Sequence, residues 1–332
     1  MKNLFISFVL LALINSCSYN DVIRVHDVYV AGYEDGVAKY WKNGEAFPLS
    51  DGTISYTYAI TVVGSDVYVA GMELDSTRSI RVAKYWKNGI GVSLTDGTKD
   101  AGAGSIDVVN NDVYVGGYEN NVAKYWKNGI EVILSDGTQN AYAIIKVVGN
   151  DIHVLISEYN TVKQTQTIKY WKNGQFTSLT DGSKYAYASA ITVDGKDVYF
   201  AGGEISDIAS GSTEVAKYWK NGTPISLTDG SKLESAIAIT VMGRDVYVAG
   251  VETQPYAFVF IKSKYWKNGV AIDLAETNSR VNAIAVVGND VYLCGVTYPP
   301  NGFGIATLWK NGVAVNLTDV NKNAGANSIF VK

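Results

Sequence analysis

A recurring glutamate carries the chemistry that this 332-residue sequence could perform. The residue appears at six roughly regular intervals, as Glu34, Glu73, Glu119, Glu158, Glu204 and Glu252. Thr297 stands where a seventh is expected. Carboxylates gathered on one face repel each other unless a cation or a basic partner is present, and they accept hydrogen bonds from sugar hydroxyls. These glutamates are therefore candidate ligand-binding residues.

A structural role is the alternative for the same glutamates. A lysine begins each copy of a tryptophan motif, at Lys39, Lys84, Lys124, Lys169, Lys217 and Lys264. The seventh copy has Thr307 there, so glutamate and lysine are lost together, as paired residues would be. Our expected strand register places Lys39 opposite Val30, about 13 Å along the strand from Glu34. We leave the ligand-binding and the ion-pair interpretations open.

Tyrosines accompany the glutamates. Tyr33, Tyr118 and Tyr298 fall in the same connections, and further tyrosines, such as Tyr142 and Tyr159, fall in this or a neighbouring connection. Aromatic rings stack on the apolar faces of sugars while carboxylates bind the hydroxyls. This combination favours a glycan as ligand, and the three first-named tyrosines join the candidate site.

Signals of catalysis are few. The chain has two histidines, and His153 occupies a strand position that is tyrosine in most repeats, which predicts a packed ring. Phosphate-binding and dinucleotide-binding glycine motifs and the nucleophile elbow are absent. Cys294 replaces an alanine and is expected to be buried and inert. We expect no cofactor and no metal, although two glutamates would suffice for a glycosidase.

The elements that position these residues form a repeat. The string Lys-Tyr-Trp-Lys-Asn-Gly or a close variant occurs seven times, around Trp41, Trp86, Trp126, Trp171, Trp219, Trp266 and Trp309. The spacings between successive tryptophans are 45, 40, 45, 48, 47 and 43 residues, which is typical of a four-stranded propeller blade. A second marker resembling Asp-Val-Tyr-Val accompanies each tryptophan. The sequence predicts an all-β fold, a seven-bladed β-propeller with four antiparallel strands in each blade.

Turn residues predict the hairpins of one repeat. Asn-Gly joins the third strand to the fourth, because a type I′ turn needs positive φ at both central residues. A glycine-containing pair before each Asp-Val-Tyr-Val joins the first strand to the second. Both tight turns are expected on one face of the ring, and the variable connections on the other. In this register Asp27 lies opposite Lys42 and Tyr29 opposite Tyr40, while the tryptophans fill the space between blades.

The two ends of the chain predict how the first blade is completed. Residues 326–331 match the first strand of a repeat, but no second strand follows them. They are expected to complete the first blade, for which residues 22–25 are the rival candidate. Such an exchange joins the first and last blades and covers an exposed edge.

The N-terminus resembles a bacterial lipoprotein signal. Residues 1–16 have a basic start and an apolar run, and the small residue Ser16 precedes Cys17. Asn15 departs from the strictest form of the lipoprotein motif, so an ordinary signal peptide is the alternative. Cys17 is the expected lipidation site, residues 17–21 a short lipid-anchored segment, and residues 22–332 the propeller. We therefore expect a bacterial envelope protein, an outer-membrane lipoprotein, that contacts membrane through its lipid anchor alone. The 28 basic and 32 acidic residues give no reason to expect nucleic acid.

Over residues 22–332 the repeats resemble uncharacterised bacterial propeller lipoproteins with Val-Tyr-Val-Ala-Gly and Lys-Tyr-Trp-Lys-Asn-Gly blades. That resemblance implies the fold and no defined activity. Our first hypothesis is a monomeric, non-catalytic binding or scaffold module whose variable face engages a glycan or a protein. The alternative is a carbohydrate-active enzyme that uses the loop-face glutamates.

Overall fold

The fold is built from β-strands alone. The computed structural model describes residues 26–205, 214–254, 257–300 and 302–332, and Cys17 and residues 22–25 lie outside these ranges. The described ranges contain 28 strands and no helix long and apolar enough to cross a bilayer. The predicted all-β class is therefore confirmed.

The second to seventh sequence repeats supply four strands each, and the first supplies three. The first repeat has β1 (Val28–Glu34), β2 (Val37–Lys42) and β3 (Glu45–Pro48), the second β4 (Ser55–Val63), β5 (Asp66–Asp75), β6 (Ile80–Lys87) and β7 (Ile90–Ser93), and the third β8 (Ala101–Val109), β9 (Asp112–Glu119), β10 (Val122–Lys127) and β11 (Ile130–Ile133). The fourth has β12 (Asn140–Val148), β13 (Asp151–Asn160), β14 (Thr165–Lys172) and β15 (Gln175–Ser178), and the fifth β16 (Tyr185–Asp194), β17 (Asp197–Ile205), β18 (Glu214–Lys220) and β19 (Thr223–Ser226). The sixth has β20 (Leu233–Met242), β21 (Asp245–Gln254), β22 (Ala257–Lys267) and β23 (Val270–Thr277), the seventh β24 (Ser279–Val287), β25 (Asp290–Thr297), β26 (Ile305–Lys310) and β27 (Val313–Asn316), and β28 (Ala324–Val331) ends the chain.

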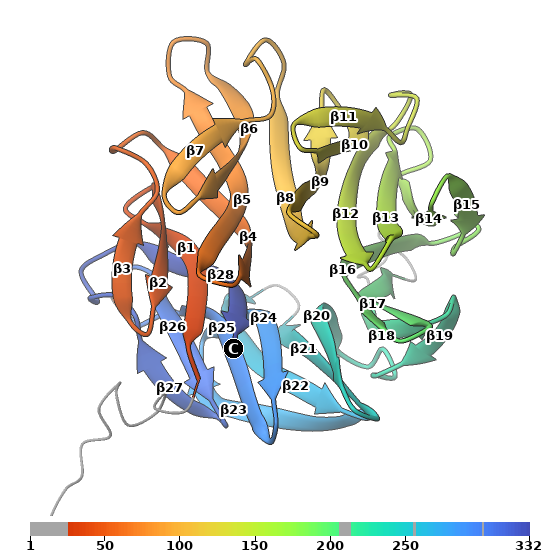
Figure 1. Cartoon of the computed structure of the whole chain (residues 1–332). Helices are drawn as coiled ribbons and strands as arrows, with labels where there is room; N and C mark the ends of the chain where they lie inside the picture. Colours follow the sequence, from red (N-terminus) through yellow and green to blue (C-terminus); the bar gives the residue numbers. More distant parts are fainter. Residues whose placement is uncertain (1–25, 206–213, 255–256, 301) are drawn as a thin grey trace, which may run out of the picture.

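These strands form six sheets arranged around a common centre (Figure 1). Five sheets have four strands, and the sixth has eight because a single parallel pair, Glu214 with Leu233, joins the fifth and sixth repeats. The first strand of each repeat lies nearest the centre and the fourth lies outermost (Figure 1). The arrangement is propeller-like.

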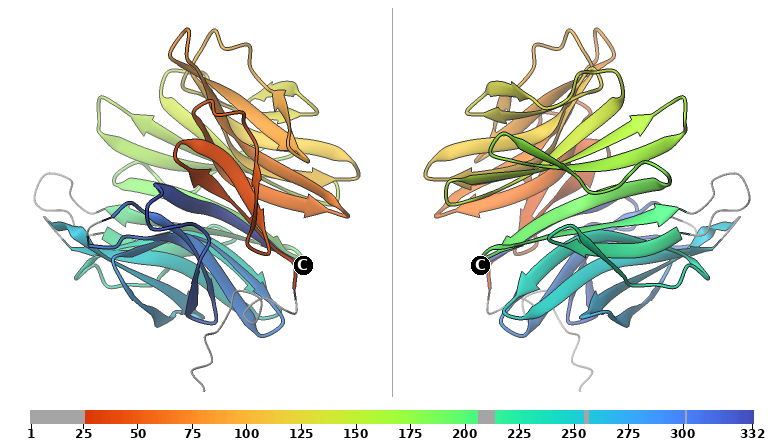
Figure 2. Two further views of the ribbon diagram at one scale, coloured as in Figure 1. Left: turned by 90° about the vertical axis from the view of Figure 1, so that its left-hand side faces the viewer. Right: turned by 90° about the vertical axis from the view of Figure 1, so that its right-hand side faces the viewer.

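The C-terminal strand completes the first sheet, as the sequence predicted. Strand β28 pairs with β1 in the order β28-β1-β2-β3. The amide of Asp27 donates to the carbonyl of Lys332 at 2.8 Å, which brings the first described residues beside the C-terminus (Figure 2).

The hydrophobic core is divided among the junctions between consecutive repeats. Seven clusters of buried side chains each combine residues of two neighbouring repeats, and one of them joins the seventh to the first. The tryptophans occupy these junctions, and every one exposes 8% of its surface or less. Their predicted packing role is confirmed. Side-chain packing holds the repeats together, with hydrogen bonds between neighbouring repeats such as that from the Ile145 amide to the Ser105 hydroxyl.

A β-bulge distinguishes six repeats from the fourth. In the second repeat Tyr58 is the extra residue, between Thr57 and Ala59. The bulge turns a backbone carbonyl toward the second strand, so a Cβ atom on Gly71 would lie 2.0 Å from the Tyr56 carbonyl oxygen. Only glycine fits there. Strands β12 and β13 pair without a bulge, and Ile156 takes the place of that glycine.

The tight-turn face carries the same hydrogen bonds in every repeat. In the second repeat, Asn88 donates through its side-chain amide to Asp66 at 2.8 Å and accepts from the amide of Val67 at 2.8 Å. Asn88 has φ 50° and Gly89 has φ 84°, as the predicted type I′ turn requires. These bonds place both tight turns of a repeat on one face, as expected.

The expected register between the second and third strands is wrong by two residues. Tyr29 lies opposite Lys42, Ala31 opposite Tyr40 and Gly32 opposite Lys39. The connection after β1 is shorter than we expected, a two-residue turn at Asp35 and Gly36, so the second strand continues through Glu34. The charge pair of Asp27 with Lys42 still forms, at 3.7 Å, but on the diagonal. The expected ring pair is replaced by the Lys42 ammonium, 5.4 Å from the Tyr29 ring centre.

Candidate functional site

Each of the six recurring glutamates contacts the first lysine of its own repeat. The Nζ–Oε distances are 2.5 Å for Lys84–Glu73, 2.7 Å for Lys124–Glu119 and Lys169–Glu158, 2.6 Å for Lys217–Glu204 and 2.9 Å for Lys264–Glu252, and Lys39 contacts Glu34 in the same way. In the seventh repeat the hydroxyls of Thr297 and Thr307 share a hydrogen bond of 2.9 Å.

The corrected register explains these ion pairs. Glu34 is the last residue of β1, two residues beyond Gly32, and Gly32 lies opposite Lys39. Residues two apart on a strand point to the same face, so glutamate and lysine meet on the diagonal. The ion-pair interpretation therefore describes the geometry of all six glutamates. Whether any of them also binds a ligand stays a prediction.

The predicted tyrosines lie over glycines on the neighbouring strand. Tyr33 pairs with Gly325, and Tyr118 pairs with Gly102. A Cβ atom on either glycine would come within 2.9 Å of the tyrosine ring. In the fifth repeat the two residue types are exchanged between the strands, because Tyr187 lies over Gly203. In each of these cross-strand pairs, the glycine leaves space for the ring of its tyrosine partner and for no second side chain.

Several tyrosines of this face are neighbours. The Tyr33 and Tyr56 ring centres are 5.4 Å apart in an edge-to-face arrangement. Burial, with the nearby Tyr298 and Tyr56 hydroxyls, raises the pKa of Tyr33. Tyr298 itself is 41% exposed, so a partner molecule can reach it. The structure thus brings Tyr33 and Tyr298 close together, while Tyr118 belongs to a different recess.

A recess of about 360 Å³ opens where the third and fourth repeats meet, and we call it the loop-face pocket. Its walls are formed by Arg81, Asp100, Tyr118, Asn121, Asn140, Ala141, Tyr142, Ser157, Tyr159 and Gln166. The volume lies within the usual range of small-molecule sites, ~300–1,000 Å³. Of the nine predicted binding residues, Tyr118 is the one that lines this pocket.

The polar side chains of the loop-face pocket are held in place by one another. The Arg81 guanidinium binds both carboxylate oxygens of Asp100, with one bond of 2.7 Å, and keeps the pKa of Asp100 below its usual value. The guanidinium carbon also lies 5.8 Å from the Tyr118 ring centre. The Arg81 guanidinium is therefore already neutralised by Asp100 and stacked on the Tyr118 ring.

Tyr142 connects two further residues of the pocket. Its hydroxyl donates to the Ala188 carbonyl at 3.1 Å. Burial raises the pKa of Tyr142, while hydrogen bonds with Ser157 and Gln166 act in the opposite direction. Gln166 exposes 6% of its surface and Ser157 2%, so both side chains are fixed rather than solvated.

Sequence analysis missed most of these residues, although one signal points to them. Arg81, Asn121 and Gln166 each stand three residues before the first lysine of their repeat. The same position in the fifth repeat is Glu214, whose carboxylate accepts hydrogen bonds from Tyr187 and, at 2.7 Å, from Ser235. Polar residues that differ between otherwise similar repeats mark this position as variable.

The nucleophiles and bases named from the sequence are buried. His153 is 3% exposed, and its Nδ1 lies 2.5 Å from the Tyr170 hydroxyl, so the predicted packed ring is confirmed. Cys294 is fully buried and free, and burial raises the pKa of its thiol. Within the described ranges no three His, Cys, Asp or Glu side chains are grouped so that they could hold a metal ion.

Comparison with known proteins supports the fold. No protein-family model and no curated protein sequence matches this chain. Among solved structures it resembles a puromycin-hydrolyzing peptidase from Mycobacterium tuberculosis (TM-score 0.52, 11% identity, 80% of this chain and 46% of that one). It also resembles one of two prolyl endopeptidases (0.52, 11%, 92% and 51%) and an acylaminoacyl peptidase (0.51, 13%, 89% and 51%). The chain spans about half the length of these structures, and such low identity indicates a shared fold alone.

Proposed function

We propose that the protein is a seven-bladed β-propeller that binds a neutral glycan, without catalysis, at its loop-face pocket. The blade count is supported by seven repeats, the first completed to four strands by β28, and by seven core clusters that each join two consecutive repeats, including the last and the first. The eight-stranded sheet is then two blades linked by one backbone pair.

The lining of the loop-face pocket is the observation that carries the proposed ligand. It offers the rings of Tyr118, Tyr142 and Tyr159 beside amide groups from Asn121, Asn140 and Gln166. Its charged groups, Arg81 and Asp100, neutralise each other. Rings that stack on CH groups and amides that donate and accept hydrogen bonds suit a sugar with no net charge.

A glycan array with the mature protein tests this function. The wild type is expected to bind one or more neutral glycans, and Gln166→Ala and Tyr118→Ala each to weaken binding at least tenfold. Gln175→Ala is the matched control, because Gln175 is an exposed residue of β15 outside the pocket. Failure of the wild type to bind any glycan, or undiminished binding by both pocket variants, would refute the proposal.

The alternative of a carbohydrate-active enzyme has its own test. Each recurring glutamate forms an ion pair with the first lysine of its repeat, so that a substrate would have to compete with the lysine for the carboxylate. Incubation with envelope and plant polysaccharides is therefore expected to release no product. Turnover that disappears in one Glu→Gln variant would replace the binding function with an enzymatic one.

We further propose that Cys17 anchors a monomer to the bacterial envelope. Asp27 lies on the tight-turn face. Cys17 precedes it by ten residues, which span at most about 35 Å when fully extended. The loop-face pocket would then point away from the membrane. Metabolic labelling with a palmitate analogue is expected to mark the wild type and not Cys17→Ser, and unlabelled wild type would refute the anchor.

A further inference from the structure

Two recesses recur at corresponding junctions of the ring. One, of about 520 Å³, lies between the fourth and fifth repeats, and the other, of about 540 Å³, between the first and second. Eight of the ten lining residues of each recess correspond in position: Ser178 to Pro48, Leu179 to Leu49, Thr180 to Ser50, Asp181 to Asp51, Ser183 to Thr53, Glu204 to Glu73, Trp219 to Trp86 and Pro224 to Gly91. We call them the rim recesses, and the connection that follows the fourth strand lines a large part of each.

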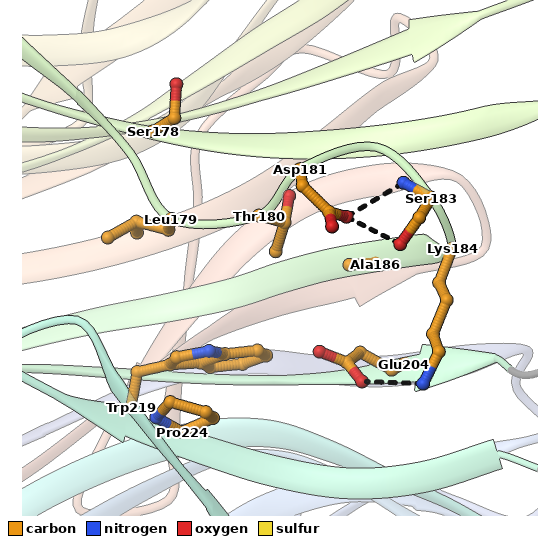
Figure 3. A pocket seen from close by; sticks show the side chains of 10 residues that line it. All are labelled: Ser178, Leu179, Thr180, Asp181, Ser183, Lys184, Ala186, Glu204, Trp219 and Pro224. Atoms are coloured by element: carbon orange, nitrogen blue, oxygen red, sulfur yellow. Dashed lines mark hydrogen bonds and ion pairs between the residues drawn. The ribbon is translucent and has the colours of Figure 1, made fainter.

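The rim recess between the fourth and fifth repeats has one apolar and one polar wall. In this recess Leu179 and Pro224 form the apolar wall, and the edge of Trp219, a ring that is 1% exposed, lies at its base (Figure 3). Asp181 and the ion-paired Glu204 stand on the polar side, where Lys184 reaches toward the Glu204 carboxylate (Figure 3). A recess with these two walls matches a pyranose ring, which has an apolar CH face and a hydroxyl edge.

The polar wall is fixed before any ligand arrives. The Asp181 carboxylate accepts from the Ser183 amide at 2.9 Å and from the Ser183 hydroxyl at 2.6 Å, which lowers the pKa of Asp181. The Asp51 carboxylate likewise accepts from the Thr53 hydroxyl at 3.0 Å. Acceptors held by such turns lose little freedom when they bind a hydroxyl group.

The residue opposite the tryptophan on the fourth strand differs between repeats. Gly91 faces Trp86 and Pro224 faces Trp219, and both leave the recess open. The corresponding residues of the third and fourth repeats are Glu131 and Phe176, which carry longer side chains. A long side chain at this position would reach into the space that the recess occupies.

From this correspondence we propose that the two rim recesses are additional binding sites, each for one neutral pyranose ring. The protein is then multivalent toward a glycan chain or surface, since separate weak sites on one rigid body add avidity without new contacts. The inference goes beyond the proposed function, because no residue of the loop-face pocket lines either recess.

The indole N–H signals of the tryptophans give a direct test by ¹H–¹⁵N NMR. Trp86 and Trp219 line the recesses, so titration with a panel of neutral methyl pyranosides is expected to shift these two signals. Trp→Phe variants assign them. If no member of the panel moves either signal, the rim sites do not exist.

Blocking variants separate the two recesses. Gly91→Phe should abolish the Trp86 shift and keep that of Trp219, and Pro224→Phe should do the reverse. Both copy Phe176, which the fourth repeat already accommodates, so both proteins are expected to fold. Shifts that survive in both blocked variants would overturn the inference.

The loop-face pocket serves as the internal control. Gln166→Ala is expected to weaken array binding as proposed above and to leave the Trp86 and Trp219 shifts unchanged. Loss of these shifts in Gln166→Ala would show that the signals report the loop-face pocket and would overturn the rim sites. Undiminished array binding by both loop-face pocket variants, with the Trp86 and Trp219 shifts intact, would remove the loop-face function without affecting the rim sites.

Discussion

The fourth repeat and the other six solve the same packing problem differently. In six repeats the first strand has an extra residue, and a glycine on the second strand receives the carbonyl that the bulge turns inward. The fourth repeat lacks the extra residue, and Ile156 fills the space of that glycine. The comparison teaches that chain length on one strand and side-chain volume on its neighbour change together.

The fourth repeat has the same hydrogen bonds on the tight-turn face as the other six repeats. Asn173 of the fourth repeat donates to Asp151 at 2.8 Å and accepts from the Ile152 amide at 2.9 Å, as its counterparts do in the other repeats. The fourth repeat also lines the loop-face pocket through Tyr142, Ser157, Tyr159 and Gln166. The repeats are therefore uniform on the tight-turn face and differ near the loops, where we propose that the ligand binds.

The largest loss of stability is expected when the glycine of a bulged repeat is replaced by isoleucine, the residue that the fourth repeat has at this position. Gly71→Ile would place Cβ 2.0 Å from the Tyr56 carbonyl oxygen, and we expect it to lower the free energy of unfolding by about 4 kcal/mol or more. Urea denaturation measures this. Deleting Tyr58 in the same chain removes the bulge and should restore much of the loss. Without such rescue, the link between bulge and glycine would be disproved.

Substitutions on the tight-turn face should lower the free energy of unfolding equally in the fourth repeat and in the bulged repeats. Asn88→Ala and Asn173→Ala each lose two side-chain hydrogen bonds and put alanine at positive φ, so each should cost about 2 kcal/mol. Thermal and urea unfolding provide the values. Asn88→Gly relieves the φ strain alone and should cost less. A clear inequality between the two alanine variants would mean that the fourth repeat differs on this face as well.

The glutamate and lysine pair should behave as a unit in the fourth repeat. Lys169→Met leaves the buried Glu158 carboxylate without its cation and should cost about 1–2 kcal/mol. Changing both residues to threonine copies Thr297 and Thr307 of the seventh repeat and should cost under about 1 kcal/mol. Equal costs for the single and double variants, measured by urea unfolding, would contradict a coupled pair.

The smallest effect concerns His153, which replaces the usual tyrosine in the fourth repeat. Burial lowers the pKa of His153 below 6.5, so the unfolded chain binds the proton more readily and stability falls as pH drops below about 6.5. Burial also raises the pKa of Tyr170 to about 12, which keeps its hydroxyl protonated beside the ring.

His153→Tyr removes this contribution. The melting temperature of the variant should therefore decline less than that of the wild type between pH 7.5 and 5.5, by about 2 °C. Differential scanning calorimetry at both pH values measures the difference. A decline at least as steep in the variant would show that His153 titrates normally in the folded protein.

Much of the fold followed from local sequence signals. Asn-Gly turns, a tryptophan every 40 to 48 residues and an unpaired first strand at the C-terminus predicted the all-β class, the four strands of the second to seventh repeats and the pairing of β28 with β1. The register between the second and third strands was predicted incorrectly. The hydrophobic pattern could not locate the turn at Asp35 and Gly36, because a shift of register by two residues leaves every side chain on the same face of the sheet.

The candidate site was less predictable. The joint loss of glutamate and lysine in the seventh repeat hinted at their contact, but the ion pairs depend on a diagonal register. The loop-face pocket combines residues of three repeats, from Arg81 to Gln166, that no spacing along the chain connects. Only the arrangement of the sheets brings them together.

The sequence alone determined the repeat and its turns, because each depends on interactions within about fifty residues that recur seven times. The tertiary structure decided which glutamates are neutralised, where glycine is required and which junctions are hollow. These properties arise between strands and between repeats, where a displacement of one or two residues decides whether side chains meet.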